Sequence, residues 1–271
     1  MASLFQTLPP RHPLNADQAE LLLEDVRADE TLTPLISAHA DFFAWLVEGS
    51  PFLARLMRCY PDVLLALQEA APEDYLDTLY TALDSEMAAA TDKDTAMALL
   101  RHVRNRAALA IALADLADAW DIETVTKYLT RLADLAVRCG LDFLLRQAVD
   151  EKRLTAFSRD GLVVLALGKH GGEELNYSSD IDFVIYYTPD ALPLAEAQDR
   201  RKFHIKLVQD LTALLQNPTA DGFVFRVDLR LRPDPGATPV TISVDAALGY
   251  YESMGQNWER AVYIKARPIA G

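Results

Sequence analysis

The chain has 271 residues, of which 40 are acidic and 26 are basic, so its formal net charge is −14. Hydrophobic residues make up 51% of the sequence, which is enough to bury a sizeable core and argues against a disordered chain. The negative charge argues against nucleic acid and anionic membranes as partners, since both bind basic surfaces.

The cysteine content and the hydropathy indicate in which cellular compartment the protein is expected. Cys59 and Cys139 are too few for a disulfide framework, which favours a reducing environment. The N-terminal residues lack the basic and apolar regions of a signal peptide. Since no apolar stretch reaches the roughly 18–20 residues of a membrane span, we expect a soluble cytoplasmic protein.

Charge and glycine are distributed unevenly along the chain. Residues 1–150 contain 24 acidic and 12 basic side chains but only two of the eleven glycines. Residues 151–271 contain 16 acidic and 14 basic side chains and the other nine glycines. The first region favours helix and the second favours turns and strands. We therefore predict a helical domain over residues 1–150 and an α/β domain over residues 151–271.

The first region is predicted to be a bundle of helices with short turns between them. Asn15 or Asp17 is suited to cap the first helix, and Gly49 is suited to end a later one. Ser50 is a good N-cap for the helix that follows it, with Pro51 at the first helical position. The expected helices cover residues 15–28, 36–50, 50–60, 61–71, 72–90, 92–120 and 121–154.

The charged side chains of these helices are interpreted as solvated surface, and a docking face for a partner is the alternative. Arg101, Arg104 and Arg106 form a small basic group. We interpret them as ordinary surface charges, with contact to a phosphate or an acidic partner as the other possibility.

The second region changes its hydrophobic period. Continuous apolar runs predict strands over residues 162–168 and 180–188, and clean alternation predicts a strand over residues 223–233. An amphipathic helix is expected over residues 193–217. Residues 243–255 and 256–271 are interpreted as further helical pieces. The predicted order is strand, glycine loop, strand, helix, strand.

Three aspartates are the candidate chemical centre. Asp180 and Asp182 open a predicted strand and share one face of it, because strand residues two apart point the same way. Two such carboxylates repel each other unless a cation neutralises them, and Mg²⁺ prefers oxygen ligands. Asp228 on the later strand is the third candidate ligand. The plain alternatives are a turn residue for Asp180 and an ion pair with a neighbouring arginine for Asp228.

The glycine loop is the candidate phosphate site. Gly168, Gly171 and Gly172 let backbone approach a phosphate closely, although the loop lacks the Walker A pattern. Lys169 and Arg232 could supply positive charge to a phosphate, and the alternative for each is an ordinary surface charge. The remaining candidate phosphate-binding residues are Arg230 and Ser179, and the alternative for Ser179 is a turn or cap role. Two metal ions held by the three carboxylates would suit in-line displacement at phosphorus.

The order of these features resembles the nucleotidyltransferases of the DNA polymerase β type, although Gly168-Lys169 replaces the usual small pair after the first glycine. Three longer blocks are similar to the bifunctional glutamine synthetase adenylyltransferase/adenylyl-removing enzyme family. They are "ALGKHGGEELNYSSDIDFVIYY", "DGFVFRVDLRLRPDPGATP" and "YYESMGQNWERAVYIKARPIAG". With the helical "SPFLARLMRCYPDVLLAL", the resemblance spans nearly the whole chain.

The resemblance implies an α+β fold, in which an N-terminal helical bundle precedes a DNA polymerase β-like nucleotidyltransferase domain. It implies that Asp180, Asp182 and Asp228 are catalytic and bind Mg²⁺. It also implies nucleotide or phosphate binding by the loop and its basic neighbours. The matching positions are Gly168, Lys169, Gly171, Gly172, Ser179, Arg230 and Arg232.

The last block looks more like the first, adenylyl-removing half of that two-halved family than like the second half. The resemblance therefore implies that phosphate attacks an adenylylated tyrosine of glutamine synthetase and releases ADP, as part of the control of nitrogen metabolism. The implied partners are glutamine synthetase, a PII-type signal protein, ATP or ADP, and phosphate. The alternatives are adenylyl transfer from ATP to a tyrosine and a non-catalytic regulatory fragment. We expect the chain to be a truncated part of a longer enzyme.

Overall fold

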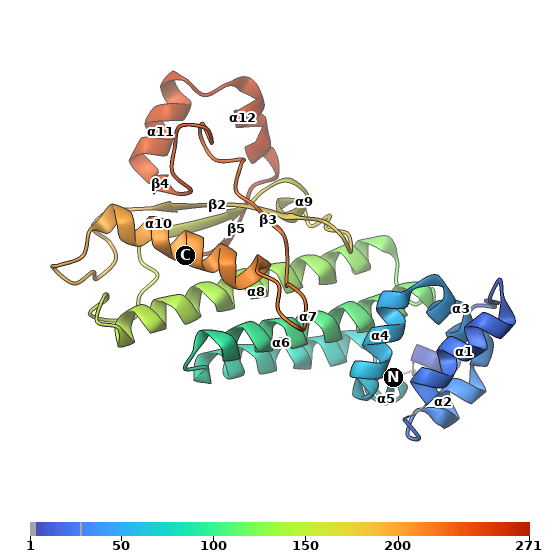
Figure 1. Ribbon diagram of the computed structural model, residues 1–271. Helices are drawn as coiled ribbons and strands as arrows, with labels where there is room; N and C mark the ends of the chain where they lie inside the picture. Colours follow the sequence, from blue (N-terminus) through green and yellow to red (C-terminus); the bar gives the residue numbers. More distant parts are fainter. Residues whose placement is uncertain (1–3, 28) are drawn as a thin grey trace. The chain divides into compact units, whose positions relative to one another are not determined.

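The computed structural model describes residues 4–27 and 29–271 of the chain (Figure 1). These residues form two compact units. One unit is the chain up to Thr81 together with Val103–Val125, and the other is Ala82–His102 together with Thr126–Gly271. The second unit thus combines the α/β region with helical residues that precede it in the sequence. The domain boundary expected near residue 150 stays a prediction.

The helices before residue 150 begin and end largely where local signals predict. The Asn15 side chain accepts a hydrogen bond from the Gln18 amide at 3.2 Å, and the Ser50 hydroxyl accepts one from the Leu53 amide at 3.3 Å. Both contacts satisfy amides that have no partner within the first turn of a helix. The elements are η1 (Leu4–Gln6), α1 (Ala16–Arg27), α2 (Thr33–Ala38), α3 (Ala40–Gly49), α4 (Pro51–Cys59), α5 (Pro61–Glu69), α6 (Pro72–Ala89), α7 (Lys93–Leu116) and α8 (Ile122–Asp150).

The single helix predicted over residues 36–50 is wrong, because the chain breaks it at His39. This residue has φ −130° and ψ 38°, outside the helical region, and it separates α2 from α3. No glycine or proline marks the break, so tertiary packing overrides a helical pattern that is locally continuous.

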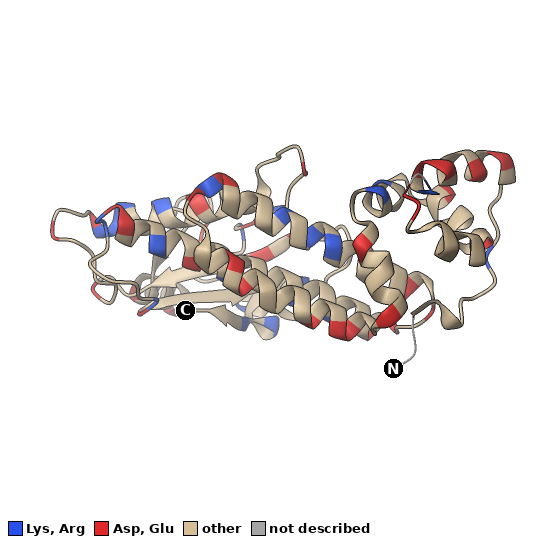
Figure 2. Ribbon diagram, turned by 90° about the horizontal axis from the view of Figure 1, so that it is seen from below, with Lys and Arg blue, Asp and Glu red and all other residues tan. Residues whose placement is uncertain are grey.

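Acidic residues recur along the long helices (Figure 2). On α6 the acidic side chains of Asp74, Asp77, Asp84 and Glu86 are exposed to solvent. In the described ranges, none of the helices combines the length and the apolar character that crossing a bilayer requires.

The second unit contains a small mixed sheet, so the fold is helix-rich α+β. Strand β1 pairs antiparallel with β2 and with β5, whereas β2 pairs parallel with β3 and with β4. The order is β3-β2-β1-β5, with β4 also paired to β2. The strands are β1 (Leu162–Ala166), β2 (Ile181–Tyr187), β3 (Val227–Asp228), β4 (Ile242–Ser243) and β5 (Arg267–Ala270).

Helices cover both faces of this sheet (Figure 1). On one face Tyr187 of β2 stacks on His204 of α10 (Arg200–Gln216), with ring centroids 3.9 Å apart. On the other face Val184 and Tyr186 form a buried cluster with Ala247 of α11 (Val244–Ser253). Alternate residues of β2 therefore enter two different apolar layers, which explains its continuous apolar run. Helix α12 (Asn257–Ala261) and the 3-10 helix η2 (Val262–Lys265) follow α11.

The long strand predicted over residues 223–233 is wrong, because only Val227–Asp228 pairs with β2. Beyond it the chain turns, since the Asp228 carboxylate accepts a hydrogen bond from the Arg230 amide at 2.8 Å. Arg232 then donates hydrogen bonds to four backbone carbonyls of the same loop. The alternating side chains therefore belong mostly to a loop and not to a paired strand.

Two other boundaries differ from the prediction. The helix expected over residues 193–217 begins only at Arg200, where Asp199 caps it by accepting a hydrogen bond from the Lys202 amide at 3.0 Å. The helical interpretation of residues 256–271 is wrong for their last part, because Arg267–Ala270 is strand β5. Pro268 is compatible with this strand because β5 lies at the edge of the sheet.

Arg101 is buried, so its interpretation as a surface charge is wrong. Its side chain is fully enclosed and donates hydrogen bonds to the carbonyls of Leu214, Asn217 and Gly222. These acceptors lie at and just beyond the C-terminal end of α10, where helix carbonyls lack partners and the helix dipole favours a cation. Arg101 therefore caps a helix that is more than a hundred positions away in the sequence.

We predict that Arg101→Ala lowers the free energy of unfolding by roughly 2–4 kcal/mol, because several buried carbonyls lose their donor. Urea unfolding followed by circular dichroism measures the change. Arg200→Ala is the control, since it removes an exposed arginine that pairs with Asp190, and such pairs contribute about 0–1 kcal/mol. Equal effects of the two substitutions would contradict the capping role.

Candidate functional site

The glycine loop is a single helical turn, α9 (Gly168–Gly171), that follows β1 directly. Gly168 has φ +54°, a conformation that favours glycine. A Cβ atom at this position would lie 2.7 Å from Oδ2 of Asp182. Glycine is therefore required for the backbone to pass this close to the carboxylate.

Gly171 and Gly172 differ in the space around them. A Cβ at Gly171 would lie 2.1 Å from the carbonyl oxygen of Lys265 and 2.6 Å from that of Ala166. At Gly172 the nearest atom would be Cδ of the Lys265 side chain, at 3.0 Å, which can move. Lys169, which follows Gly168 in the turn, is exposed. The turn thus packs its backbone against β1 and η2 and leaves its lysine in solvent.

The structure places the three aspartates at the start of β2 and on β3. Asp180 directly precedes β2, and Asp182 is the second residue of that strand. Asp182 and Asp228 are partners in the parallel register of β2 and β3. The short β3 strand is therefore long enough to set Asp228 beside Asp182.

Two of the three carboxylates are neutralised by arginines. Asp180 pairs with Arg226, which also donates to the Ser178 carbonyl at 2.6 Å. Asp228 accepts hydrogen bonds from the side chain of Arg230, including one of 2.6 Å to Oδ2. Among the described residues, the carboxylate of Asp182 makes no hydrogen bond or ion pair. Asp182 is thus the uncompensated charge of the group.

The pKa values of Asp182 and Asp228 shift in opposite directions, because only Asp228 is paired with an arginine. Burial raises the pKa of Asp182, and the neighbouring charges of Asp228 and Asp180 raise it further, against smaller opposing effects of His170 and Arg230. The hydrogen bond from Arg230 lowers the pKa of Asp228. Since burial and like charge disfavour an ionised carboxylate, Asp182 is the position where a bound cation would relieve the most repulsion.

By their chemistry, these residues fit a hard divalent cation, because carboxylates that repel one another are stabilised by such an ion. As they stand, however, no three acidic, histidine or cysteine side chains in the described parts of the chain are arranged to hold a metal ion. Arg226 and Arg230 occupy the carboxylates of Asp180 and Asp228 instead. The predicted metal-binding roles stay predictions.

The remaining candidates lie around this centre in different ways. The Ser179 hydroxyl donates to Oδ1 of Asn176 at 2.9 Å, which makes it part of a local turn. The Arg230 side chain is 82% exposed, so its outer surface is open to an anion. Arg232 is engaged with loop carbonyls. Arg226 was not singled out from the sequence, because its place between Phe225 and Val227 in an alternating run gave no signal.

We predict that Gly171→Ala destabilises the chain by roughly 2–4 kcal/mol, because its Cβ would meet two backbone oxygens that cannot move independently. Gly172→Ala should cost less than about 1 kcal/mol, since only the flexible side chains of Lys265 and Glu174 must shift. Thermal unfolding of the two variants tests the difference. If both are tolerated equally, the turn does not pack as described.

We predict that Asp182→Asn raises the free energy of unfolding at pH 7 in buffer with a chelator. A carboxyl whose pKa is raised in the folded chain stabilises the fold below its unfolded pKa, about 3.9, and loses that contribution as the pH rises through the folded pKa. The advantage of the variant should therefore shrink as the pH falls toward 4. Urea unfolding at a series of pH values measures it.

Asp228→Asn is the matched control for this experiment. The pKa of Asp228 is lowered, so its contribution to stability is present above its unfolded pKa and is lost as the pH falls. The control should be less stable than the unmodified chain at pH 7. A stability of Asp182→Asn that matches the unmodified chain at every pH would contradict the assignment of Asp182 as the uncompensated charge.

The sequence of the chain matches a known protein family. The sequence pattern of the glutamate-ammonia ligase adenylyltransferase family matches residues 43–271. The match includes the glycine turn and all three aspartates. It covers more than half of the chain.

Individual relatives agree with this match, and each is named as a bifunctional glutamine synthetase adenylyltransferase/adenylyl-removing enzyme. The Xanthobacter autotrophicus protein is 44% identical over 274 residues, which cover 95% of this chain and 27% of the relative. A Rhodopseudomonas palustris protein is 45% identical over 286 residues, which cover 100% of this chain and 29% of the relative. The Caulobacter vibrioides protein is 41% identical over 280 residues, which cover 100% of this chain and 28% of the relative. The chain therefore spans somewhat more than a quarter of the length of these relatives.

Proposed function

The chain belongs to the glutamate-ammonia ligase adenylyltransferase family, and from this premise we propose that it is a nucleotidyltransferase module that removes adenylyl groups from glutamine synthetase. In the proposed reaction, phosphate and an adenylylated tyrosine give ADP and free tyrosine. The activity would regulate nitrogen assimilation, and a PII-type signal protein is the proposed regulatory partner. We also propose a DNA polymerase β-like domain over residues 151–271 and a helical N-terminal region over residues 1–150.

The uncompensated carboxylate of Asp182 is the observation that supports this proposal most strongly. It is half-buried, it lies against the backbone of Gly168, and it is in register with Asp228. Leaving such a charge unpaired is unfavourable for folding, and perturbed carboxylates of this kind cluster at functional sites. Its position beside a glycine turn suits a reaction in which a cation and a phosphate meet.

Mg²⁺ held by Asp180, Asp182 and Asp228 would supply the positive charge that activates the attacking oxygen and stabilises the leaving oxygen. The protein's own residues orient the reactants. The Gly168 turn lets backbone approach the phosphates, and the exposed side chains of Lys169 and Arg230 attract them.

The proposed bond changes balance as an in-line displacement at phosphorus. A phosphate oxygen forms a bond to the adenylyl phosphorus while the bond from that phosphorus to the tyrosyl oxygen breaks. The electron pair of the broken bond stays on the tyrosyl oxygen, which then takes a proton from solvent. The products are ADP and the tyrosine hydroxyl.

The proposed direction rests on a resemblance, because the block "GQNWERAVYIKARPIAG" looks more like the adenylyl-removing half of the family than like the adenylyl-adding half. Chemistry at the metal site does not distinguish the directions, because both transfer the same adenylyl group between oxygens. The assay must therefore measure both products.

We predict that the chain releases ADP from adenylylated glutamine synthetase only with Mg²⁺ and phosphate, and that Asp180→Asn and Asp182→Asn each lower this rate by about 100-fold or more. Chromatographic detection of ADP measures the rate. Asp190→Asn is the control, because Asp190 is an exposed acidic residue that pairs with Arg200. This control should retain the unmodified rate.

Three results would contradict the proposal. ADP release from the aspartate variants at the unmodified rate would exclude their catalytic roles. Pyrophosphate release from ATP and unmodified glutamine synthetase, without ADP release from the adenylylated form, would reverse the direction. Calorimetric binding of nucleotide with no turnover under any condition would indicate a regulatory module.

A further inference from the structure

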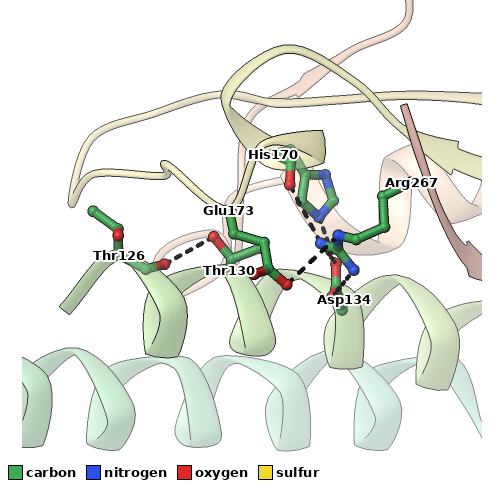
Figure 3. Close-up of polar contacts among 6 residues, drawn as sticks. All are labelled: Thr126, Thr130, Asp134, His170, Glu173 and Arg267. Carbon is green, nitrogen blue, oxygen red and sulfur yellow. Dashed lines mark hydrogen bonds and ion pairs between the residues drawn. The ribbon is translucent and has the colours of Figure 1, made fainter. Parts of the chain in front are cut away.

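Asp134 of α8 connects the glycine turn to the edge of the sheet (Figure 3). Its Oδ1 lies 2.8 Å from Nε2 of His170, the residue after Lys169 in the turn. The guanidinium of Arg267 on β5 donates to both carboxylate oxygens, over 2.6 Å to Oδ2 and 3.1 Å to Oδ1. One carboxylate from a helix thus holds two segments that are far apart in the sequence.

Arg267 also contacts the turn itself. Its guanidinium donates to the carbonyl oxygen of His170 at 3.3 Å, and its Nε lies 3.7 Å from Oε1 of Glu173 (Figure 3). A second tie lies next to it, where Nζ of Lys265 contacts the carboxylate of Glu174 at 2.6 Å. The segment 265–267 therefore fixes the turn at both His170 and the residues that follow it.

His170 transmits this restraint to the proposed phosphate site. Its side chain is completely buried, so it has no solvent-exposed alternative position. The turn around it is closed by hydrogen bonds from the Gly171 amide to the Leu167 carbonyl and from the Gly172 amide to the Gly168 carbonyl. A displacement of His170 must therefore displace Gly168, whose backbone lies against Asp182.

The charge of Asp134 matters to this arrangement. Although burial favours its neutral form, hydrogen bonds from His170 and Arg267 outweigh that effect and lower the pKa of Asp134. An ionised carboxylate offers acceptor sites on both oxygens, whereas an asparagine amide would turn an NH₂ donor toward one of the two donors. Asparagine at this position therefore fits the space, but in either orientation its NH₂ group faces a donor nitrogen of Arg267, so the two-pronged contact with Arg267 is lost.

We propose that Asp134 is a positioning residue for the Gly168–Gly172 turn, acting through His170 and Arg267 to hold that turn against Asp182. It does not contact the reacting atoms. The inference rests on the proposed function in so far as the turn binds phosphate or ADP. It places a residue that positions the candidate phosphate site on helix α8, outside the α/β region.

The test compares Asp134→Asn with Asp142→Asn in the full chain. Asp142 lies on the same helix, is 10% exposed and accepts two hydrogen bonds from the Arg159 guanidinium, but it makes no contact with the turn. Both variants thus lose a comparable arginine–carboxylate pair. We expect Asp134→Asn alone to raise the KM for phosphate and the Kd for ADP by about 10-fold to 100-fold, since small misplacements of binding groups have effects of this size.

Hydrogen exchange supplies a readout that does not need activity. The amides of Gly171 and Gly172 should exchange faster in Asp134→Asn and stay unchanged in Asp142→Asn. If Asp134→Asn fails to fold, Arg267→Lys replaces it, because lysine keeps the charge but loses the two-pronged contact. Calorimetry with ADP and the phosphate dependence of the rate complete the set.

Each outcome decides the inference. Faster exchange together with weaker ADP binding in Asp134→Asn alone supports it. Unchanged exchange, or faster exchange with unchanged ADP affinity, overturns it, as do equal effects in both variants. If the unmodified chain neither binds ADP nor releases it, the proposed function fails, and the exchange of the two glycine amides then decides whether Asp134 positions the turn.

Discussion

The antiparallel pairing of β1 with β2 is the constraint on which the candidate site depends. Ala166 pairs with Phe183, and the Leu167 amide donates to the Asp182 carbonyl at 2.9 Å. The end of β1 therefore meets the start of β2, and the glycine turn that follows one strand lies beside the aspartates that open the other. Parallel pairing of the same two strands would have placed the turn and the aspartates at opposite ends of the sheet.

The site keeps one unfavourable charge in place. Arg226 and Arg230 neutralise the two flanking aspartates, while Asp182 stays unpaired, half-buried and raised in pKa. Local repulsion of this kind persists only where surrounding packing holds the geometry, and it is typical of sites arranged for a ligand. Here the buried β1–β2 pair and the tightly packed Gly171 supply that rigidity.

The acidic helical region contributes more than a solvated surface. Arg101 of α7 caps the end of α10, and Asp134 of α8 joins the glycine turn to β5. Arg101 and Asp134 each bind residues that lie far away in the sequence, such as Leu214 for Arg101 and Arg267 for Asp134. The net charge of this region, concentrated on exposed helix faces, conceals these two sets of polar contacts.

The sequence by itself determined the features that depend on near neighbours. Ser50 with Pro51 begins a helix, apolar runs form β1 and β2, and the aspartates stand at the start of β2. Tertiary structure alone decided the break at His39, the two-residue length of β3, the strand β5 and the partners of Asp134. The physical reason is that periodicity and capping act over a few residues, whereas a strand's partner or a buried charge's acceptor comes from chain folded back from far away.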